Sequence, residues 1–245
     1  MVELKENERI DDLEFHGLKI IQNNDGFCFG IDSVLISDFA KEIKKDSIVL
    51  DLGTGTGIIS ILLSRKTELK KIYGIEIQEE VADMAKRSII LNDLQDKVDI
   101  INSDIKDLIN IFKENSIDSI VTNPPYKKLN TGITNNNEKK LISRHEITAS
   151  LEDFIKISSR LLRNNGAFYM VHRPDRLVDI IDLLRKYRLE PKKIRFVLPN
   201  VDKAANLILI KAVKCGKPFL KMEKNLYVYN LDGSYTDEIL KIYNK

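Results

Sequence analysis

Cysteine is scarce in this sequence, with only two among 245 residues, and long apolar runs are missing. Cys28 and Cys215 are far apart and form no CxxC or Cys/His spacing, so neither a disulfide framework nor a zinc site is indicated. The first residues are polar and acidic, without the apolar centre of a signal peptide, and no apolar run reaches membrane-spanning length. We therefore expect a cytoplasmic protein with no membrane segment and no bound metal.

A strong overall charge is also missing, because the net charge is only +2. Its distribution is uneven: residues 181–225 carry twelve Lys or Arg against four Asp or Glu, and residues 1–30 carry seven acidic side chains against three basic ones. The basic segment can attract nucleic-acid phosphates, although dispersed lysines are also typical of an ordinary solvated face. The length allows one α/β domain with an addition, or one enlarged domain.

The most informative stretch is residues 48–57, Ile-Val-Leu-Asp-Leu-Gly-Thr-Gly-Thr-Gly. β-favouring residues, an acidic residue, alternating glycines and a following apolar run predict a strand, a tight turn and a helix N-terminus. Glycine lets the backbone lie against a ligand, and the helix N-terminus favours a carboxylate or phosphate. The dinucleotide fingerprint is not met, because its last glycine would fall on Ile58. The spacing resembles motif I of class I methyltransferases that use S-adenosylmethionine (SAM). The expected cofactor contacts in this stretch are Asp51, Gly53, Gly55 and Gly57.

Carboxylates also follow the next two expected strands. Glu76 ends the strand at residues 71–76, where its side chain can accept hydrogen bonds from both ribose hydroxyls of a bound adenosine. Asp104 follows the strand at residues 98–101. It can receive the adenine amino group or, equally, cap the helix expected at residues 105–112.

The tetrapeptide Asn123-Pro124-Pro125-Tyr126 follows the fourth strand, expected at residues 117–122. The first and fourth strands of a doubly wound sheet flank its switch point, so this tetrapeptide is expected across the crevice from the glycine turn. The amino nitrogen of adenine is a poor nucleophile because its lone pair is delocalised into the ring. The Asn123 side-chain oxygen and the Pro124 carbonyl can accept its two hydrogens, and Tyr126 can stack on a flipped-out base. We expect these three residues to be catalytic, with Asn123 also touching the cofactor.

Two segments are expected beside this site. Residues 14–22 and 27–29 predict a β-hairpin around an Asn-Asn-Asp-Gly turn, followed by a helix that Asp32 or Ser33 caps. A cofactor contact by Asp32 is the less favoured alternative. Hairpin and helix form the first unit, residues 1–45, which packs on a catalytic domain at residues 46–245 and lies over the cofactor mouth.

Substrate contacts are expected from the segments that follow the fourth and fifth strands. Lys127, Lys128 and Arg144 belong to a polar, Asn-rich loop and can hold phosphates, although a solvated loop is an equal alternative. Arg173 follows a fifth strand at residues 167–171, between helices at 151–162 and 176–188. The last strands, at residues 192–198 and 206–213, are joined directly, which implies an antiparallel pair.

Four stretches together resemble one family. They are Phe29-Gly30-Ile31-Asp32-Ser33-Val34-Leu35, Arg144-His145-Glu146, the run from His172 to Leu177, and Gly233-Ser234-Tyr235-Thr236. The chain is similar to the bacterial tRNA1(Val) (adenine(37)-N6)-methyltransferases from about residue 12 almost to the C-terminus. The resemblance implies SAM as cofactor, with contacts at Gly53, Glu76, Asp104 and Asn123, and a tRNA adenine beside the anticodon as target. It implies a Rossmann-like α/β fold, with a seven-stranded, mostly parallel sheet whose last strand is antiparallel. We expect a monomer.

Other functions fit parts of the pattern. A glutamine methyltransferase of release factors would use the same Asn-Pro-Pro-Tyr motif, but such enzymes carry a separate N-terminal helical domain, and here only a hairpin and one helix precede the glycine motif. N6-adenine methylation of another RNA or of DNA needs the same chemistry. A non-enzymatic RNA-binding module would predict a degraded cofactor site, whereas this sequence keeps every expected position.

Overall fold

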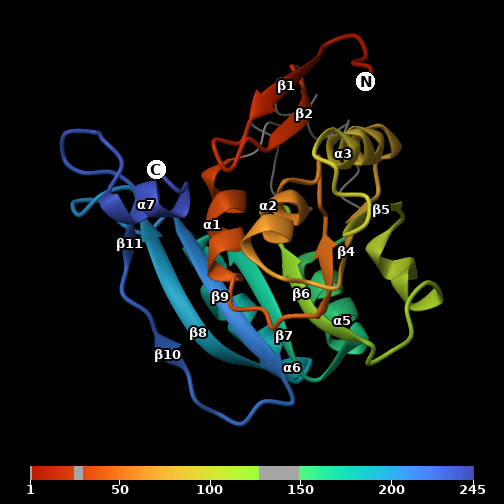
Figure 1. Ribbon diagram of the computed structural model, residues 1–245. Coiled ribbons are helices and arrows are strands. Elements are labelled where there is room, and N and C mark those ends of the chain that lie inside the picture. Colours follow the sequence, from red (N-terminus) through yellow and green to blue (C-terminus); the bar gives the residue numbers. More distant parts are fainter. Residues whose placement is uncertain (1, 25–29, 127–148) are drawn as a thin grey trace, which may run out of the picture.

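One sheet organises the chain, and the computed structural model describes residues 2–24, 30–126 and 149–245 (Figure 1). Its strand order is β10-β8-β9-β7-β6-β3-β4-β5, with β11 pairing β8. The main strands are β3 Ile48–Leu52, β4 Lys71–Glu76, β5 Val98–Asn102, β6 Ile117–Thr122, β7 Leu162–His172, β8 Leu189–Leu198 and β9 Leu207–Lys214. All neighbours in this set are parallel except β9, which is antiparallel to both β7 and β8. The expected mostly parallel sheet with an antiparallel last strand is confirmed for these seven strands, and among the described residues the whole sheet has nine.

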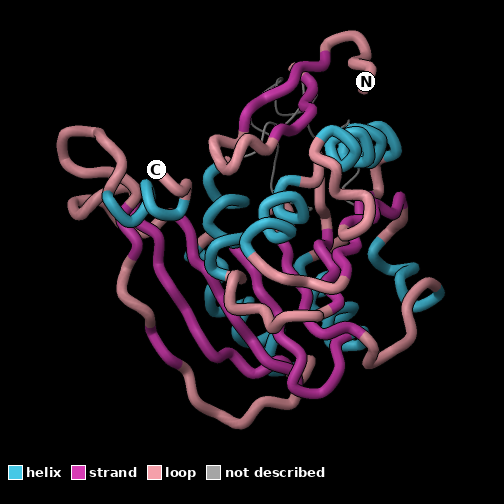
Figure 2. The backbone as a smooth tube through the Cα atoms, in the orientation of Figure 1, coloured by secondary structure: helices cyan, strands magenta, loops and turns pink. Residues whose placement is uncertain are grey.

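Helices cover both faces of this sheet, as Figures 1 and 2 show. The helices are α1 Ile31–Phe39, α2 Ile58–Lys66, α3 Glu79–Leu91, η1 Ile105–Asn110, α5 Leu151–Leu161, η2 Pro174–Arg176, α6 Leu177–Lys186 and α7 Asp237–Ile242. Successive side chains of a strand point to opposite faces, so a strand covered on both faces is apolar throughout. In β3, Val49 joins the core under α1, α2 and α3, whereas Leu50 joins the core under α5 and α6.

The N-terminal hairpin differs from the expected one. Its strands are β1 Glu8–Asp12 and β2 Lys19–Asn23, so residues 14–18 form the turn and the expectation of a strand across them is wrong. The turn places Glu14, His16 and Gly17 at φ values of 53°, 51° and 68°. Residues other than glycine rarely adopt left-handed backbone, so the sequence gives little indication of a turn at Glu14 and His16. The Asn-Asn-Asp-Gly run is a stronger turn signal, and the hairpin was therefore expected around it. The expected partner strand at residues 27–29 lies outside the described residues.

The hairpin is held against α3 by hydrogen bonds and an ion pair. The Ser88 hydroxyl accepts from the Ile21 N–H at 2.9 Å, and Asn92 bonds both the N–H and the carbonyl of Lys19. Arg87 pairs with Glu8 through two hydrogen bonds of 2.6 Å. The hairpin therefore shares its core with the rest of the fold.

Other boundaries shift modestly. Strand β7 begins at Leu162, directly after α5, and not at residue 167 as expected, and a register irregularity against β6 accommodates the extra residues. The segment after Asp104 is a 3₁₀ helix, and α6 is preceded by the separate turn η2. Two short strands, β10 Lys221–Met222 and β11 Leu226–Tyr227, were not expected and extend the sheet beyond β8.

Candidate active site

The site begins where β3 and β6 end. Leu52 and Thr122 are register partners, and the Thr122 hydroxyl donates to the Leu52 carbonyl at 2.8 Å. The glycine turn and the Asn-Pro-Pro-Tyr segment therefore leave the sheet side by side. This is the placement that the sequence predicted for the two motifs.

The glycine turn has the backbone that its sequence demands. Gly53, Gly55 and Gly57 have φ values of 71°, 58° and 94°, a left-handed region that other residues adopt at a cost. The N–H groups of Gly53 and Thr54 both donate to the Ile75 carbonyl at 2.9 Å, which fixes the turn against the end of β4. A Cβ built on Gly55 would meet no atom within 4 Å. The turn thus presents bare backbone to open space.

Asp51 lies beneath this turn and is fully buried. Its Oδ2 accepts from the Thr54 hydroxyl at 2.6 Å and from the N–H and hydroxyl of Ser60 at 3.1 and 2.8 Å. Burial raises the pKa of Asp51 to about 6, although these hydrogen bonds oppose the shift. The carboxylate ties the turn to the first residues of α2 and has no exposed surface to offer a ligand.

Glu76 stands at the end of β4 and faces the turn. Its Oε2 accepts from the Gly55 N–H at 3.1 Å, and its Oε1 accepts from the Gln78 N–H at 2.9 Å. A carboxylate accepts hydrogen bonds and donates none, so Glu76 is chemically suited to the hydroxyls of a sugar. The Glu76 carboxylate and the open space at Gly55 therefore belong to one cradle, and the residues present fit an adenosine-containing cofactor.

Asp104 acts as a helix cap. Its side chain accepts from the Lys106 N–H at 2.9 Å and pairs with the Lys106 ammonium at 3.3 Å. The expected capping role is confirmed. Asn102 brings this strand end to the cradle, because its amide donates to the carbonyls of Glu76 and Ile77, both at 2.9 Å.

Asn123, Tyr126 and Asp32 form one hydrogen-bonded cluster. The Asn123 amide nitrogen donates to Asp32 Oδ2 at 3.1 Å, and the Tyr126 hydroxyl lies 2.7 Å from both Asp32 Oδ2 and Asn123 Oδ1. Burial and the Asp32 charge raise the pKa of the Tyr126 phenol, so it remains a donor at neutral pH. Asp32 does not cap α1 as expected: the cap is Gly30, with no side-chain hydrogen bond.

His172 closes this cluster from the end of β7. It is fully buried, its ring lies 5.1 Å from the Tyr126 ring, and its Nδ1 accepts from the Arg173 N–H at 2.8 Å. Burial, together with the charge of Arg176, lowers the pKa of His172 to about 4, so the ring is neutral. Among the described residues, His172 Nε2 is a buried atom with no hydrogen-bond partner.

Of the four basic residues expected to contact the substrate, only Arg173 lies among the described residues. Arg173 is exposed at the end of β7, and its charge acts on the Tyr126 phenol, so it lies on the expected edge. Lys127, Lys128 and Arg144 lie outside the described residues. Pro124 is buried directly after Asn123.

Several residues that hold the site in place were not identified from the sequence. Thr54 and Ser60 hold Asp51, and Thr122 joins the two strand ends. In β4, a Cβ on Gly74 would come within 2.7 Å of Ile100 and 2.9 Å of the Thr54 hydroxyl, so the turn packs where only glycine fits. The sequence signal was limited to a glycine inside a strand that also contains Ile72, Tyr73 and Ile75.

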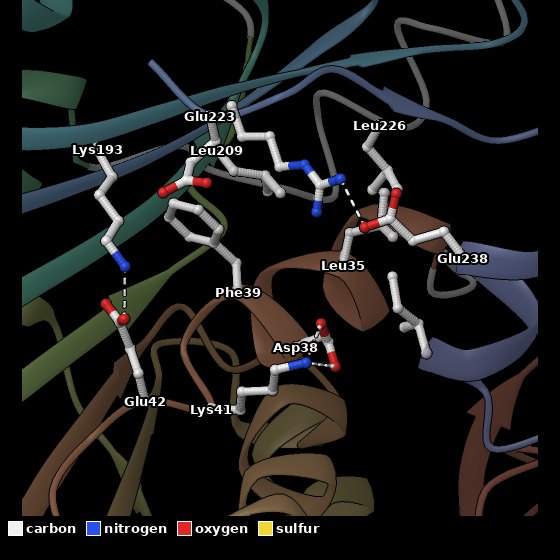
Figure 3. Close-up of a pocket in the computed structure, with 12 residues that line it drawn as sticks. Leu35, Asp38, Phe39, Lys41, Glu42, Lys193, Leu209, Glu223, Leu226 and Glu238 are labelled. Atoms are coloured by element: carbon white, nitrogen blue, oxygen red, sulfur yellow. Dashed lines mark hydrogen bonds and ion pairs between the residues drawn. The ribbon is translucent and has the colours of Figure 1, made fainter. Parts of the chain in front are cut away.

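A separate cavity of about 210 Å³ lies between α1, α7 and the strands β8 and β9 (Figure 3). Phe39, Leu35 and Leu209 give it an apolar part, and its charges are paired, with Lys193 on Glu42 and Lys41 on Asp38. None of its lining residues belongs to the expected site.

In residues 2–24, 30–126 and 149–245, no group of three or more His, Cys, Asp or Glu side chains could hold a metal ion. In the same part of the chain, no helix is long and apolar enough to cross a membrane.

Comparison with known proteins gives a family match. Residues 29–186 match the family described as methyltransferase small domain. A tRNA1(Val) (adenine(37)-N6)-methyltransferase of Porphyromonas gingivalis is 31% identical over 239 residues, which cover 95% of this chain and 93% of that protein. A protein of the same name from Pedobacter heparinus is 25% identical, covering 91% of this chain and 92% of the relative.

Solved structures agree with this match at the level of the fold. A predicted O-methyltransferase from Agrobacterium tumefaciens has a TM-score of 0.69 at 18% identity, covering 87% of this chain and 95% of that chain. A tRNA m1G37 methyltransferase from M. jannaschii has a TM-score of 0.60 at 16% identity, covering 86% of this chain and 58% of that one. At these identities the likeness shows the fold alone.

Fold, motifs and family match define the class, a SAM-dependent class I methyltransferase. SAM is therefore the cofactor of this chain. Within that class, the chain belongs to the family of the tRNA1(Val) (adenine(37)-N6)-methyltransferases. The family expectation from the sequence is confirmed.

Proposed function

We propose that this chain methylates the exocyclic N6 of an adenine in tRNA, next to the anticodon, at position 37 of valine tRNA. The observation that carries the proposal is the Asn123 amide, which is fixed at the end of β6 beside the glycine turn. The names of the relatives supply the substrate, because the same chemistry serves several amino groups.

Cofactor binding falls to the cradle at the ends of β3, β4 and β5. Gly53, Gly55 and Gly57 let the backbone approach SAM, and Glu76 accepts from the ribose hydroxyls. Asp104 lies beside them as an acceptor for the adenine amino group, and Asn123 completes the contacts from β6. Asp51 acts indirectly, since its buried carboxylate shapes the turn.

When bound, SAM would supply an electrophilic methyl group to N6 and would keep the electrons of the broken methyl–sulfur bond, with one N6 proton lost to solvent. The protein orients the amine. Asn123 Oδ1 and the Pro124 carbonyl accept its two hydrogens, which turns the nitrogen lone pair towards the methyl group. Tyr126 stacks on the flipped-out base, a contact worth about 1–3 kcal/mol in single-strand complexes.

Substrate phosphates are the expected partners of Arg173 and of Lys127, Lys128 and Arg144. An anticodon-loop adenine is already single-stranded, so flipping it costs little. A tRNA substrate implies a cytoplasmic enzyme. We expect a monomer, since Asp32, Asn123 and Tyr126 come together within one copy of the chain.

Labelled SAM tests this proposal directly. The enzyme is incubated with unmodified bulk tRNA and, in parallel, with release factors, and the labelled RNA is digested to nucleosides. Label recovered as N6-methyladenosine supports the proposal. Label in the release factors alone would preserve the chemistry and replace the substrate with a glutamine amide.

A further inference from the structure

Asp32 lies between the two residues that are expected to handle the target base. One carboxylate oxygen, Oδ2, accepts from the Asn123 amide nitrogen at 3.1 Å and from the Tyr126 hydroxyl at 2.7 Å. Its other oxygen, Oδ1, accepts from the Ser33 N–H at 3.0 Å. Asp32 is separated from Asn123 and Tyr126 by more than 90 residues of sequence, so only the fold brings them together.

We propose that Asp32 is a positioning residue that keeps the Asn123 amide oxygen available to the target amine. The inference rests on the proposed function, in which Asn123 Oδ1 is the acceptor. It assigns to Asp32 a role in orienting the amino group, whereas the sequence suggested a helix cap or a cofactor contact.

The neighbours of Asn123 fix the orientation of its side-chain amide. An asparagine side chain has a donating end and an accepting end of nearly the same shape, so only its neighbours decide which end faces the substrate. The Asn123 amide nitrogen donates to Asp32 Oδ2 at 3.1 Å and to the Ser33 hydroxyl at 3.4 Å. An inverted amide would place its oxygen against the Asp32 carboxylate, which repels it. Asp32 therefore directs Oδ1 away from α1.

Tyr126 has a single hydroxyl hydrogen to donate. Two acceptors, Asp32 Oδ2 and Asn123 Oδ1, lie at the same 2.7 Å from the phenol oxygen, but one hydrogen satisfies only one of them fully. Hydrogen bonds to a charged acceptor are stronger than those to a neutral amide. Asp32 consequently draws the hydrogen to itself, and Asn123 Oδ1 can accept from the incoming amine. Without Asp32, the phenol would donate to Asn123 and compete with the substrate.

The start of α1 is built to place this carboxylate. A Cβ added to Gly30 would come within 2.7 Å of Asp32 Oδ1, so the Asp32 side chain lies back over Gly30. Because Ser33 also holds Oδ1, the other oxygen is left to face β6.

Four variants test the role: Asp32→Ala, Asp32→Asn, Tyr126→Phe and the double variant Asp32→Ala/Tyr126→Phe. Asp38→Asn is the matched control, because Asp38 lies on the same helix and pairs elsewhere, with Lys41 and Lys66. Each protein is assayed for kcat of methyl transfer at saturating SAM and tRNA, and separately for the dissociation constant of SAM by calorimetry without tRNA.

We expect Asp32→Ala to lower kcat about 10- to 100-fold while the dissociation constant of SAM stays within about twofold. Asp32→Asn retains an oxygen acceptor but lacks the charge that draws the Tyr126 hydrogen, so it should recover only a small part of the loss. The double variant should be about fivefold faster than Asp32→Ala, because removing the phenol hydroxyl unblocks Asn123 Oδ1. A helix-stabilising role alone would give no such recovery.

Two results would overturn the inference. In one, the double variant is slower than Asp32→Ala, so the two losses accumulate. In the other, Asp32→Ala weakens SAM binding and leaves kcat unchanged, which would make Asp32 a cofactor contact. Failure of the proposed function is separate, because the unsubstituted enzyme would then transfer no methyl group to tRNA at all.

Discussion

The hydroxyl of Tyr126 lies 2.7 Å from the amide oxygen of Asn123, the atom that the proposed reaction needs as an acceptor. The two residues are therefore coupled before any substrate arrives. Asp32 Oδ2 lies at the same 2.7 Å and draws the phenol hydrogen, so in the proposed reaction Asn123 Oδ1 accepts from the target amine. Stacking on Tyr126 and orientation of the amine are then linked through the Asp32 carboxylate.

Asn123→Ala should abolish methyl transfer while leaving SAM binding largely intact. We expect a fall in kcat of at least about 1000-fold, because the acceptor acts where the reacting nitrogen is oriented. Steady-state kinetics and calorimetry with SAM measure the two effects separately. Near-normal turnover, or loss of SAM binding, would remove Asn123 from the acceptor role.

Glu76→Gln should weaken SAM binding about 10-fold or more, because an amide offers one accepting oxygen where the carboxylate offers two. Glu79→Gln is the control, since Glu79 is exposed in the first turn of α3. Calorimetry on both variants gives the comparison. Equal affinity in the two would place the ribose elsewhere.

Gly55→Ala tests the open space at the turn. The backbone at Gly55, with φ of 58°, costs an alanine about 1–2 kcal/mol in stability, and the new methyl group would point into the cofactor cradle. Gly17→Ala is the matched control, because Gly17 has φ of 68° and equally open surroundings but lies in the hairpin turn. Both variants should lose similar stability in urea unfolding. Only Gly55→Ala should lose SAM binding, and intact binding would contradict the cradle.

Acid should destabilise the fold through His172. Its pKa is about 4 in the folded protein, below the ordinary value near 6.5. The unfolded chain therefore binds a proton first as the pH falls, and folding stability decreases by about 3 kcal/mol between pH 7 and pH 4 from this group. His172→Asn keeps an acceptor for the Arg173 N–H and should lack this loss. Urea unfolding across the range checks it, and parallel pH curves for the two proteins would refute the assignment.

The central strands and both motifs were predictable because their signals are local. Apolar strands ending in an acidic residue, glycine or Asn-Pro-Pro-Tyr specify a doubly wound sheet whose strand ends meet at one edge. The register of Leu52 with Thr122 then brings the motifs together. Family resemblance added the substrate, which the chemistry alone leaves open.

Features set by tertiary contacts were not predictable in the same way. The hairpin turn uses left-handed backbone at Glu14 and His16, which the sequence signals weakly. Strands β10 and β11 have only two residues each and form through pairing with β8. Only Oδ1 of Asp32 contacts its own helix, whereas Oδ2 turns to Asn123 and Tyr126, because the fold brings the segment after β6 next to α1.

One measurement tests the central claim most directly. Unmodified valine tRNA transcript and the same transcript with guanine in place of the adenine at position 37 are incubated with labelled SAM, and digested nucleosides are separated. The account predicts labelled N6-methyladenosine from the first transcript and none from the second. Equal labelling of both transcripts, or of neither, would contradict it.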